Sequence, residues 1–242
     1  EILERYRGRI PEEVFTTPYV PPKTDGSGWP RQNLLTALDI LAEAGWVVRD
    51  MQLVNAETGE QFSFEFLYVD QSQERVLLPF FFNLRRLGIE VRPRLVDTSQ
   101  YINRVRARDF DMMIFNNGQA LSPGNEQRDQ WGSAGADQPS SRNLAGIKDP
   151  VIDELIELVI AAPSRESLIQ RTRALDRVLL WGHYVIPQLI APFDRILYWD
   201  KFGRPDRVPL NGPDPLRWWV DAEKAATLDQ RRRSIGDEEK GS

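Results

Sequence analysis

The stretch QFSFEFLYVD, residues 61–70, decides the fold class when it is read together with the apolar segment that follows it. Phe62, Phe64, Phe66 and Tyr68 alternate with polar or smaller residues. Alternation with a period of two is typical of a strand that buries one face. Aromatic side chains in such a stripe belong to a core more often than to a ligand platform. We therefore expect a strand over residues 62–69 whose aromatic face is buried.

The following segment, RVLLPFFFNLRRLGIEVRPRLV (residues 75–96), predicts a helix and then a second strand. Apolar residues from Leu77 to Leu87 recur at helical spacing and end at Gly88, although Pro79 must either kink the helix or begin its regular part. Residues 89–96 alternate again, and Pro93 favours an edge strand. A strand, a helix and a strand at this separation predict a βαβ unit with parallel strands.

The rest of the chain extends this α/β pattern. Apolar spacing predicts a helix from residue 33 to Gly45, and helices that begin at Asp149–Pro150 and at Ser164. A short helix over 101–106, capped by Thr98 or Ser99, and a buried strand over 111–115 are expected between them. Five prolines in the first 30 residues predict an extended N-terminal segment over 1–30. We expect one α/β domain over 31–189, followed by a segment over 190–242 with a charged tail.

Residues 116–146 are rich in Gly, Asn, Gln and Ser and show no periodicity. A polar loop of this length inside a compact domain is unusual, and such loops are often functional. The alternative is that the loop only covers the edge of the sheet.

Composition excludes several classes of site. The chain has no cysteine, so thiol catalysis, thiolate metal sites and disulfides are absent. A net charge of -5 argues against broad nucleic-acid binding, which needs clustered positive charge. No apolar run is long enough to span a membrane.

The sequence also offers little support for catalysis. The single histidine, His183, ends an apolar helix and is interpreted as a packed or capping residue. The carboxylate pairs Asp109 with Asp111 and Glu154 with Glu157 lack further oxygen ligands at regular spacing. No phosphate-binding loop and no nucleophile elbow occur. We expect no enzymatic activity, no metal site and no cofactor.

Four local patterns, in one order, carry a family resemblance. They are Leu-Ala-Glu-Ala-Gly-Trp ending at Trp46, Asn-Leu-Arg-Arg-Leu-Gly-Ile-Glu-Val over 83–91, Arg-Asp-Phe-Asp-Met over 108–112, and the run from Asn143 to Leu155. Together they resemble the C-terminal region of family 5 extracellular solute-binding proteins, which serve peptide and nickel ABC importers. The resemblance implies a type II periplasmic-binding-protein-like lobe with a mainly parallel sheet. It also implies that the N-terminal lobe and signal sequence lie outside this chain, and that 190–242 returns toward that lobe.

The resemblance places the ligand site in the loop after the third strand. In the family an acidic residue there pairs with the ligand's α-amine, and Ala120 stands near that position here. Glu126 is the nearest carboxylate that could take over, with Trp131 as an apolar wall. The further candidate contacts are Asn116, Asn117, Gln119, Asn125, Arg142 and Asn143.

These features predict the substrate-binding component of a periplasmic ABC importer, which captures a peptide or peptide-like solute and delivers it to the membrane permease. The expected partners are the solute, the permease and the N-terminal lobe, with no nucleic acid. Two alternatives stay open: a binder of a sugar or nickel complex, and a small α/β hydrolase or transferase domain that uses carboxylates.

Overall fold

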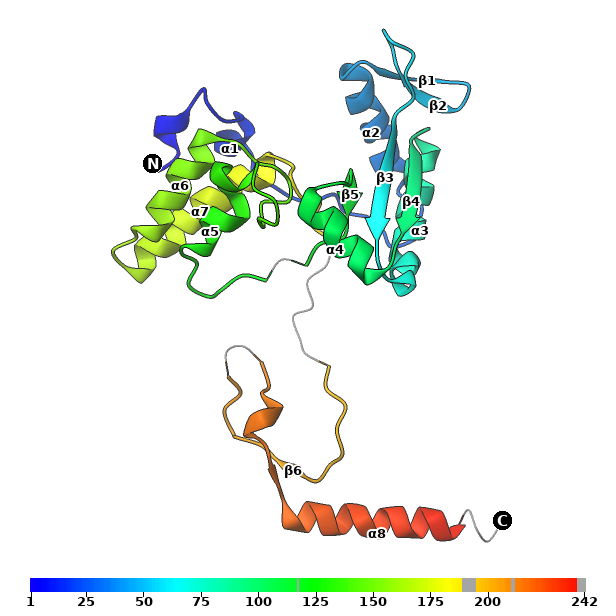
Figure 1. Ribbon diagram of the computed structural model, residues 1–242, viewed down its shortest axis with the longest axis vertical. Coiled ribbons are helices and arrows are strands. Elements are labelled where there is room, and N and C mark those ends of the chain that lie inside the picture. The colour runs from blue at the N-terminus through cyan, green and yellow to red at the C-terminus, as the bar shows by residue number, and fades with distance from the viewer. Residues whose placement is uncertain (117, 189–194, 210–211, 239–242) are drawn as a thin grey trace. The chain divides into compact units, whose positions relative to one another are not determined.

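The computed structural model describes residues 1–116, 118–188, 195–209 and 212–238. The chain divides into two compact units, Glu1–Ile186 and Pro187–Ser242 (Figure 1). No helix in the described ranges is long and apolar enough to cross a bilayer.

The predicted βαβ unit is confirmed. Strand β3 (Ser63–Tyr68), helix α3 (Glu74–Arg86) and strand β4 (Glu90–Leu95) follow one another, and β3 pairs with β4 in parallel over their full lengths (Figure 1). Helix α3 begins before Pro79, which it contains. The aromatic face of β3 is buried as expected, because Phe66 and Tyr68 pack with Leu77 and Phe81 of α3.

Strand β5 is shorter than predicted. Only Met112–Met113 pairs with β3, also in parallel, so the strand order is β4-β3-β5 and β4 lies at an edge, as Pro93 indicated. The Asp111 side chain accepts a hydrogen bond from the Glu65 backbone N–H at 2.7 Å and so replaces a ladder bond. Phe115 is exposed, because the chain leaves the sheet before reaching it.

A hairpin that the sequence did not reveal follows the first long helix. Helix α2 (Arg31–Glu43) ends as expected before Gly45, and strands β1 (Trp46–Arg49) and β2 (Gln52–Asn55) then pair antiparallel. Leu53 of β2 packs with Leu87 and Ile89 in a second small core.

The N-terminal segment is not extended throughout, which corrects the prediction for 1–30. Residues Glu4–Tyr6 form a 3-10 turn (η1) and Glu13–Thr16 a short helix, α1. Tyr6, Ile10 and Val14 are buried, and the burial of these side chains outweighs the preference of the nearby prolines for extended backbone. Residues 17–30 contain no helix or strand.

The largest core lies between this segment and two long helices. Helix α6 (Pro150–Ile160) is capped by Asp149, and α7 (Arg165–Trp181) by Ser164, as predicted. Ile152, Leu155 and Val178 are among the residues that form the core with Tyr6 and Val14. The Arg177 guanidinium donates to the backbone carbonyls of Val14 and Thr17 and fastens the N-terminal segment to α7.

Helix α4 (Thr98–Ala107) is capped by Asp97, whose side chain accepts from the Gln100 N–H at 2.9 Å, and not by Thr98 or Ser99. The long loop is also more regular than predicted. Helix α5 (Glu126–Trp131) and a 3-10 turn, η3 (Ser133–Gly135), interrupt it. Such short elements lack the repeat that makes a helix visible in a sequence.

The second unit contains a short antiparallel pair, β6 (Phe202–Gly203) with β7 (Trp219–Val220), and a turn, η4 (Pro215–Arg217). Tyr198 and Trp218 meet edge to face with ring centroids 4.8 Å apart. Helix α8 (Ala222–Glu238), which the sequence analysis did not predict, follows within the segment expected to carry a charged tail.

Candidate functional site

The site is built on the chain that leaves the carboxyl end of β5. In open α/β sheets, ligands usually bind beyond the carboxyl ends of the strands. Residues 118–125 run from this edge to α5, which packs beside α6. The geometry of the segment therefore depends on what holds α5 and the residues after it.

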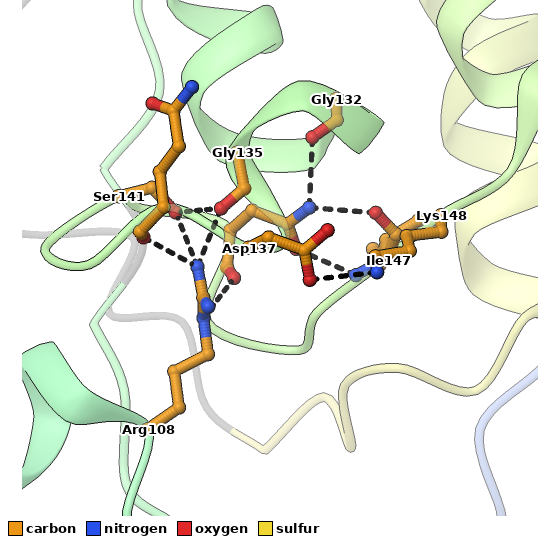
Figure 2. A network of polar contacts seen from close by, with 9 residues as sticks. Arg108, Gly132, Gly135, Asp137, Ser141, Ile147 and Lys148 are labelled. Carbon is orange, nitrogen blue, oxygen red and sulfur yellow. Dashed lines mark hydrogen bonds and ion pairs between the residues drawn. The ribbon is translucent and has the colours of Figure 1, made fainter.

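The buried side chain of Asn143 connects Gly132 with Ile147 through hydrogen bonds, and both of these residues are labelled in Figure 2. Asn143 has no exposed surface, and its side-chain Nδ2 donates to the carbonyls of Gly132 at 3.0 Å and Ile147 at 2.9 Å. Its Oδ1 accepts from the Ile147 N–H at 2.9 Å. These bonds join the end of α5 to the chain that enters α6. Asn143 has no surface left for a solute, and we assign it a structural role in place of the predicted ligand contact.

Arg108, at the end of α4, makes a second set of hydrogen bonds to the loop (Figure 2). Its backbone adopts a left-handed conformation (φ 53°) as the C-cap of α4. Its side chain donates to the carbonyls of Asn143 at 3.2 Å, Gln138 at 2.9 Å and Gly135, and to the Ser141 hydroxyl at 2.9 Å. A guanidinium can serve several acceptors at once because it presents five N–H donors. Arg108 thus joins α4 to the loop.

The amide side chains of Gln119, Gln127 and Gln130 hold the segment after β5 against α5. Gln127 and Gln130 of α5 are buried, with 4% and 3% of their surfaces exposed. Gln119 accepts from Gln127 Nε2 at 2.9 Å and donates to Gln130 Oε1. Because one side chain engages both, Gln119 anchors the segment after β5 onto α5.

A groove of about 480 Å³ lies between this anchored segment and α7. Its walls are mostly apolar. The residues that line it are Gln119, Ala120, Leu121, Pro123, Gln127, Trp131, Arg165, Leu168, Ile169, Thr172, Arg173, Leu175, Asp176 and Leu179. Predominantly apolar walls with a few polar groups are typical of small-ligand sites.

Three charged residues of α7 line the groove. Arg165 donates to the Leu121 carbonyl at 2.6 Å and the Ser122 hydroxyl at 3.1 Å, so it supports the loop. The Asp176 side chain is exposed and has no hydrogen bond or ion pair with any described residue, and partial desolvation by its neighbours raises the pKa of its carboxyl above the ordinary value.

The predicted contacts have different environments. Gln119 and Trp131 line the groove. Asn116 is exposed, and Asn117 lies outside the described residues. Arg142 is exposed; its backbone N–H donates to Asp129 Oδ1 at 3.4 Å, and its carbonyl accepts from the Leu144 N–H at 2.9 Å.

Asn125 and Glu126 are engaged within their own turn. Asn125 accepts from Arg128 at 2.8 Å. Glu126 accepts from the Gly124 N–H at 2.8 Å, and this bond lowers the pKa of its carboxyl. Glu126 is not among the groove-lining residues.

Sequence reasoning missed the contribution of α7. The apolar spacing that predicts this helix runs through Leu168, Thr172, Leu175 and Leu179 and is typical of a buried face, whereas these residues also form a groove wall. The available signal was that Arg165, Ile169 and Asp176 fall on the same helical face as that stripe.

The residues considered for catalysis are engaged elsewhere. Asp109 pairs with Arg104, and Glu157 with Arg128, each within 2.7 Å. His183 is exposed just beyond the end of α7, and its ring centroid lies 6.2 Å from that of Tyr19 and 6.0 Å from that of Trp181. No cluster of three or more metal-ligating side chains occurs in the part of the chain that the structure describes.

Comparison with known proteins identifies the family. Residues 2–139 match the family model for bacterial extracellular solute-binding proteins, family 5, middle region. The chain is 49% identical over 218 residues to the uncharacterized protein y4wM of Sinorhizobium fredii, covering 90% of this chain and 33% of that protein. It is 45% identical over 220 residues to the probable peptide-binding protein YejA of Agrobacterium fabrum, covering 90% of this chain and 36% of that protein.

Solved structures agree on the fold. The oligopeptide-binding protein AppA of Bacillus subtilis, in complex with a nonapeptide, aligns with a TM-score of 0.56 at 20% identity, over 76% of this chain and 37% of AppA. The chain spans about a third of the length of the curated relatives that it matches. The family model covers more than half of the chain, and the chain therefore belongs to the family 5 bacterial extracellular solute-binding proteins.

Proposed function

We propose that this chain supplies one wall of the ligand cleft in a solute-binding protein that captures a peptide or peptide-like solute. The observation that carries the proposal is the groove between residues 119–123, α5 and α7. It lies on the chain that leaves the carboxyl end of a parallel strand and combines apolar walls with amide side chains. Membership of family 5 and the similarity to a protein named peptide-binding support the same conclusion.

The chemistry of the groove suits a peptide of variable sequence. Trp131 and Ile169 offer apolar surface to side chains, whereas Gln119, which is exposed, carries an amide that matches a peptide backbone. Contacts to backbone groups carry little sequence preference, because every peptide presents the same N–H and C=O groups. Gln119 and Trp131 therefore remain proposed contacts, and Ile169 joins them.

The proposed cycle of solute capture and delivery requires the full-length protein. We infer that capture occurs in the periplasm, that a second lobe closes over the solute by a hinge motion, and that the closed form delivers it to an ABC permease. Residues of the second unit, such as Trp199 and Trp219, expose large apolar side chains. Exposed apolar surface of this kind marks contact sites. We propose that the segment over 190–242 packs against the N-terminal lobe.

The test uses the full-length protein. Native mass spectrometry of freshly purified protein identifies a copurified solute, and calorimetric titration with mixed tri- to pentapeptides measures binding. A copurified sugar or nickel complex, with no heat from peptides, would replace the peptide assignment. Turnover of a bound peptide or ester would instead favour the hydrolase alternative.

A matched pair of variants locates the site. Ile169→Ala removes apolar surface from the groove, whereas Ile40→Ala removes it from an exposed position on α2. A buried contact of this size contributes about 1–2 kcal/mol, or roughly 5- to 30-fold in Kd. We expect weaker peptide binding for Ile169→Ala alone. Equal affinities for the two variants would exclude the groove as the site.

A further inference from the structure

The outward face of helix α3 carries large apolar side chains beside arginines. Leu78 and Phe82 are 55% and 53% exposed. Arg75 and Arg85 are also exposed, and their side chains have no hydrogen bond or ion pair with any described residue. Because these four positions are three or four residues apart, they form one stripe along the helix, away from the side that packs on β3.

Trp29 extends this stripe from the N-terminal segment. Its ring is 50% exposed, and the Arg86 guanidinium lies 3.6 Å from its centroid and 4.2 Å from the centroid of the Phe82 ring. Arg86 also donates to Asn83 Oδ1 at 2.8 Å. A contiguous exposed apolar patch, unlike single exposed residues, marks a contact site. We call this surface the α3 outer face, and it consists of Trp29, Arg75, Leu78, Phe82, Arg85 and Arg86.

The charge of this region is opposite to that of the chain. Residues 74–95 contain five arginines and two glutamates, a net charge of +3, whereas the whole chain carries -5. Glu74 accepts a hydrogen bond from the Tyr68 hydroxyl at 2.9 Å, and Glu90 lies on β4. Salt screens exposed charges beyond about 8 Å at physiological ionic strength, so a partner at the α3 outer face interacts mainly with its arginines. The complementary partner is therefore negatively charged and accepts apolar side chains.

The free edge of β4 argues against a protein partner that adds a strand. The N–H groups of Glu90 and Val96 donate to β3, so by the period of two Pro93 directs its backbone toward the free edge. Proline has no N–H to offer to an added strand. A groove of about 230 Å³ between α3 and β4 instead offers apolar surface, with Arg85 as its charged lining residue. A lipid can use such a surface because it needs no backbone donor.

We propose that the α3 outer face binds the surface of a membrane that contains anionic phospholipids. Trp29 and Phe82 enter the interface between headgroups and acyl chains, where aromatic side chains are enriched. Arg75 and Arg85 contact the phosphates, which guanidinium groups bind well. An arginine close to an anionic membrane surface contributes roughly a fivefold factor in affinity. This contact goes beyond solute capture, since it holds the binding protein beside the membrane.

The test is cosedimentation of the full-length protein with vesicles of phosphatidylcholine alone, or with about half of it replaced by phosphatidylglycerol. Wild-type protein is expected to bind the anionic vesicles at least about tenfold more tightly, and high salt should weaken this binding. The double variant Arg75→Gln/Arg85→Gln should lose about tenfold or more in affinity for the anionic vesicles. Leu78→Ala should weaken binding by about threefold, whereas Ile40→Ala, at an exposed position on α2, should not.

The double variant Arg94→Gln/Arg106→Gln is the matched control for charge. Glu65 alternates with Phe66, which packs on α3, and Glu65 pairs with Arg104 of α4, so α4 covers the opposite face of the sheet. Arg94 shares the Glu65 face, and Arg106 lies on α4; both are exposed. This control removes the same charge and should keep the wild-type affinity for vesicles within about twofold. Thermal melting confirms that each variant is folded.

The possible outcomes separate the membrane contact from other partners and from solute capture. Equal binding to the two kinds of vesicle, or equal losses in the two double variants, overturns the proposal. Absence of binding to both also overturns it and leaves the α3 outer face to an acidic protein. None of the substituted residues lines the groove between α5 and α7, so peptide titration should give the wild-type affinity in every variant. Failure of the membrane contact therefore leaves the proposed function intact.

Discussion

Asn143→Ala tests whether one buried side chain holds the candidate site together. The substitution removes three hydrogen bonds, of 3.0, 2.9 and 2.9 Å, from a side chain with no exposed surface. It leaves the Ile147 carbonyl and the Ile147 N–H without partners, whereas the Gly132 carbonyl still accepts from the Gly135 N–H at 3.0 Å. Each buried group left unsatisfied costs about 1–3 kcal/mol. We therefore expect the free energy of unfolding to fall by about 3–5 kcal/mol.

The assay is urea denaturation of the chain, followed by circular dichroism, with amide hydrogen exchange at Ile147 as a local probe. Asn116→Ala is the control, because Asn116 is exposed and follows β5 in the same loop system. A surface change of this kind alters stability by about 0.5 kcal/mol or less. If Asn143→Ala is as stable as this control, and Ile147 keeps its protection, the reasoning from buried polar groups is refuted.

Asn143→Asp adds a pH-dependent form of the same experiment. Aspartate can still accept from the Ile147 N–H, but it has no donors and its negative charge faces two carbonyls. The folded-state pKa of this carboxyl is therefore raised above the unfolded value of about 3.9. The variant is fully destabilised above the folded pKa. Stability recovers as the pH falls toward 3.9, because the protonated group can donate one bond. A stability difference from wild type that does not change with pH would contradict this account.

Three further outcomes are expected. Gly88→Ala should lower the free energy of unfolding, measured by urea denaturation, by about 2–4 kcal/mol, because φ is +84° and a Cβ would lie 2.5 Å from the Leu53 nitrogen. Gly45→Ala is the control: Gly45 has the same φ but open space around it, so the substitution should cost about 1–2 kcal/mol. Equal costs would show that the close approach to β2 is unimportant. Trp131→Ala should weaken peptide binding by about tenfold or more in calorimetry, whereas Glu126→Gln should change it less than about threefold, because that carboxylate is engaged with the Gly124 N–H. The reverse order would move the site to Glu126. The chain alone should give an α/β circular dichroism spectrum and a cooperative melt, since it contains its own cores; a random-coil spectrum would contradict this.

Periodic segments were the part of the fold that could be predicted from the sequence. The alternation from Phe62 to Tyr68 and the helical spacing from Leu77 to Leu87 both appear as expected in β3 and α3. Asp149 and Ser164 begin α6 and α7 as their capping chemistry predicts. These features depend on neighbours within a few residues, and local physical chemistry is enough to specify them.

Short elements and the N-terminal segment could not be predicted in this way. Helix α5 has six residues, and β5 pairs over two, so neither shows a repeat. Val14 is buried although it lies among prolines, because Arg177 of α7 holds the backbone of that segment from 163 residues away. Such contacts have no signature in the local sequence.

The same distinction between local sequence and tertiary contacts applies to the candidate site. The sequence by itself determined the α/β class, the starts of α6 and α7 and the position of a polar loop after a parallel strand, because each follows from local periodicity, capping chemistry or composition. Only the tertiary structure decided which residues of that loop face a groove. Asn143 is buried as a structural residue, whereas Ile169 and Asp176 of α7, which lie outside the loop, line the groove. The physical reason is that exposure depends on what packs against a residue from distant parts of the chain, and a local pattern does not contain that information.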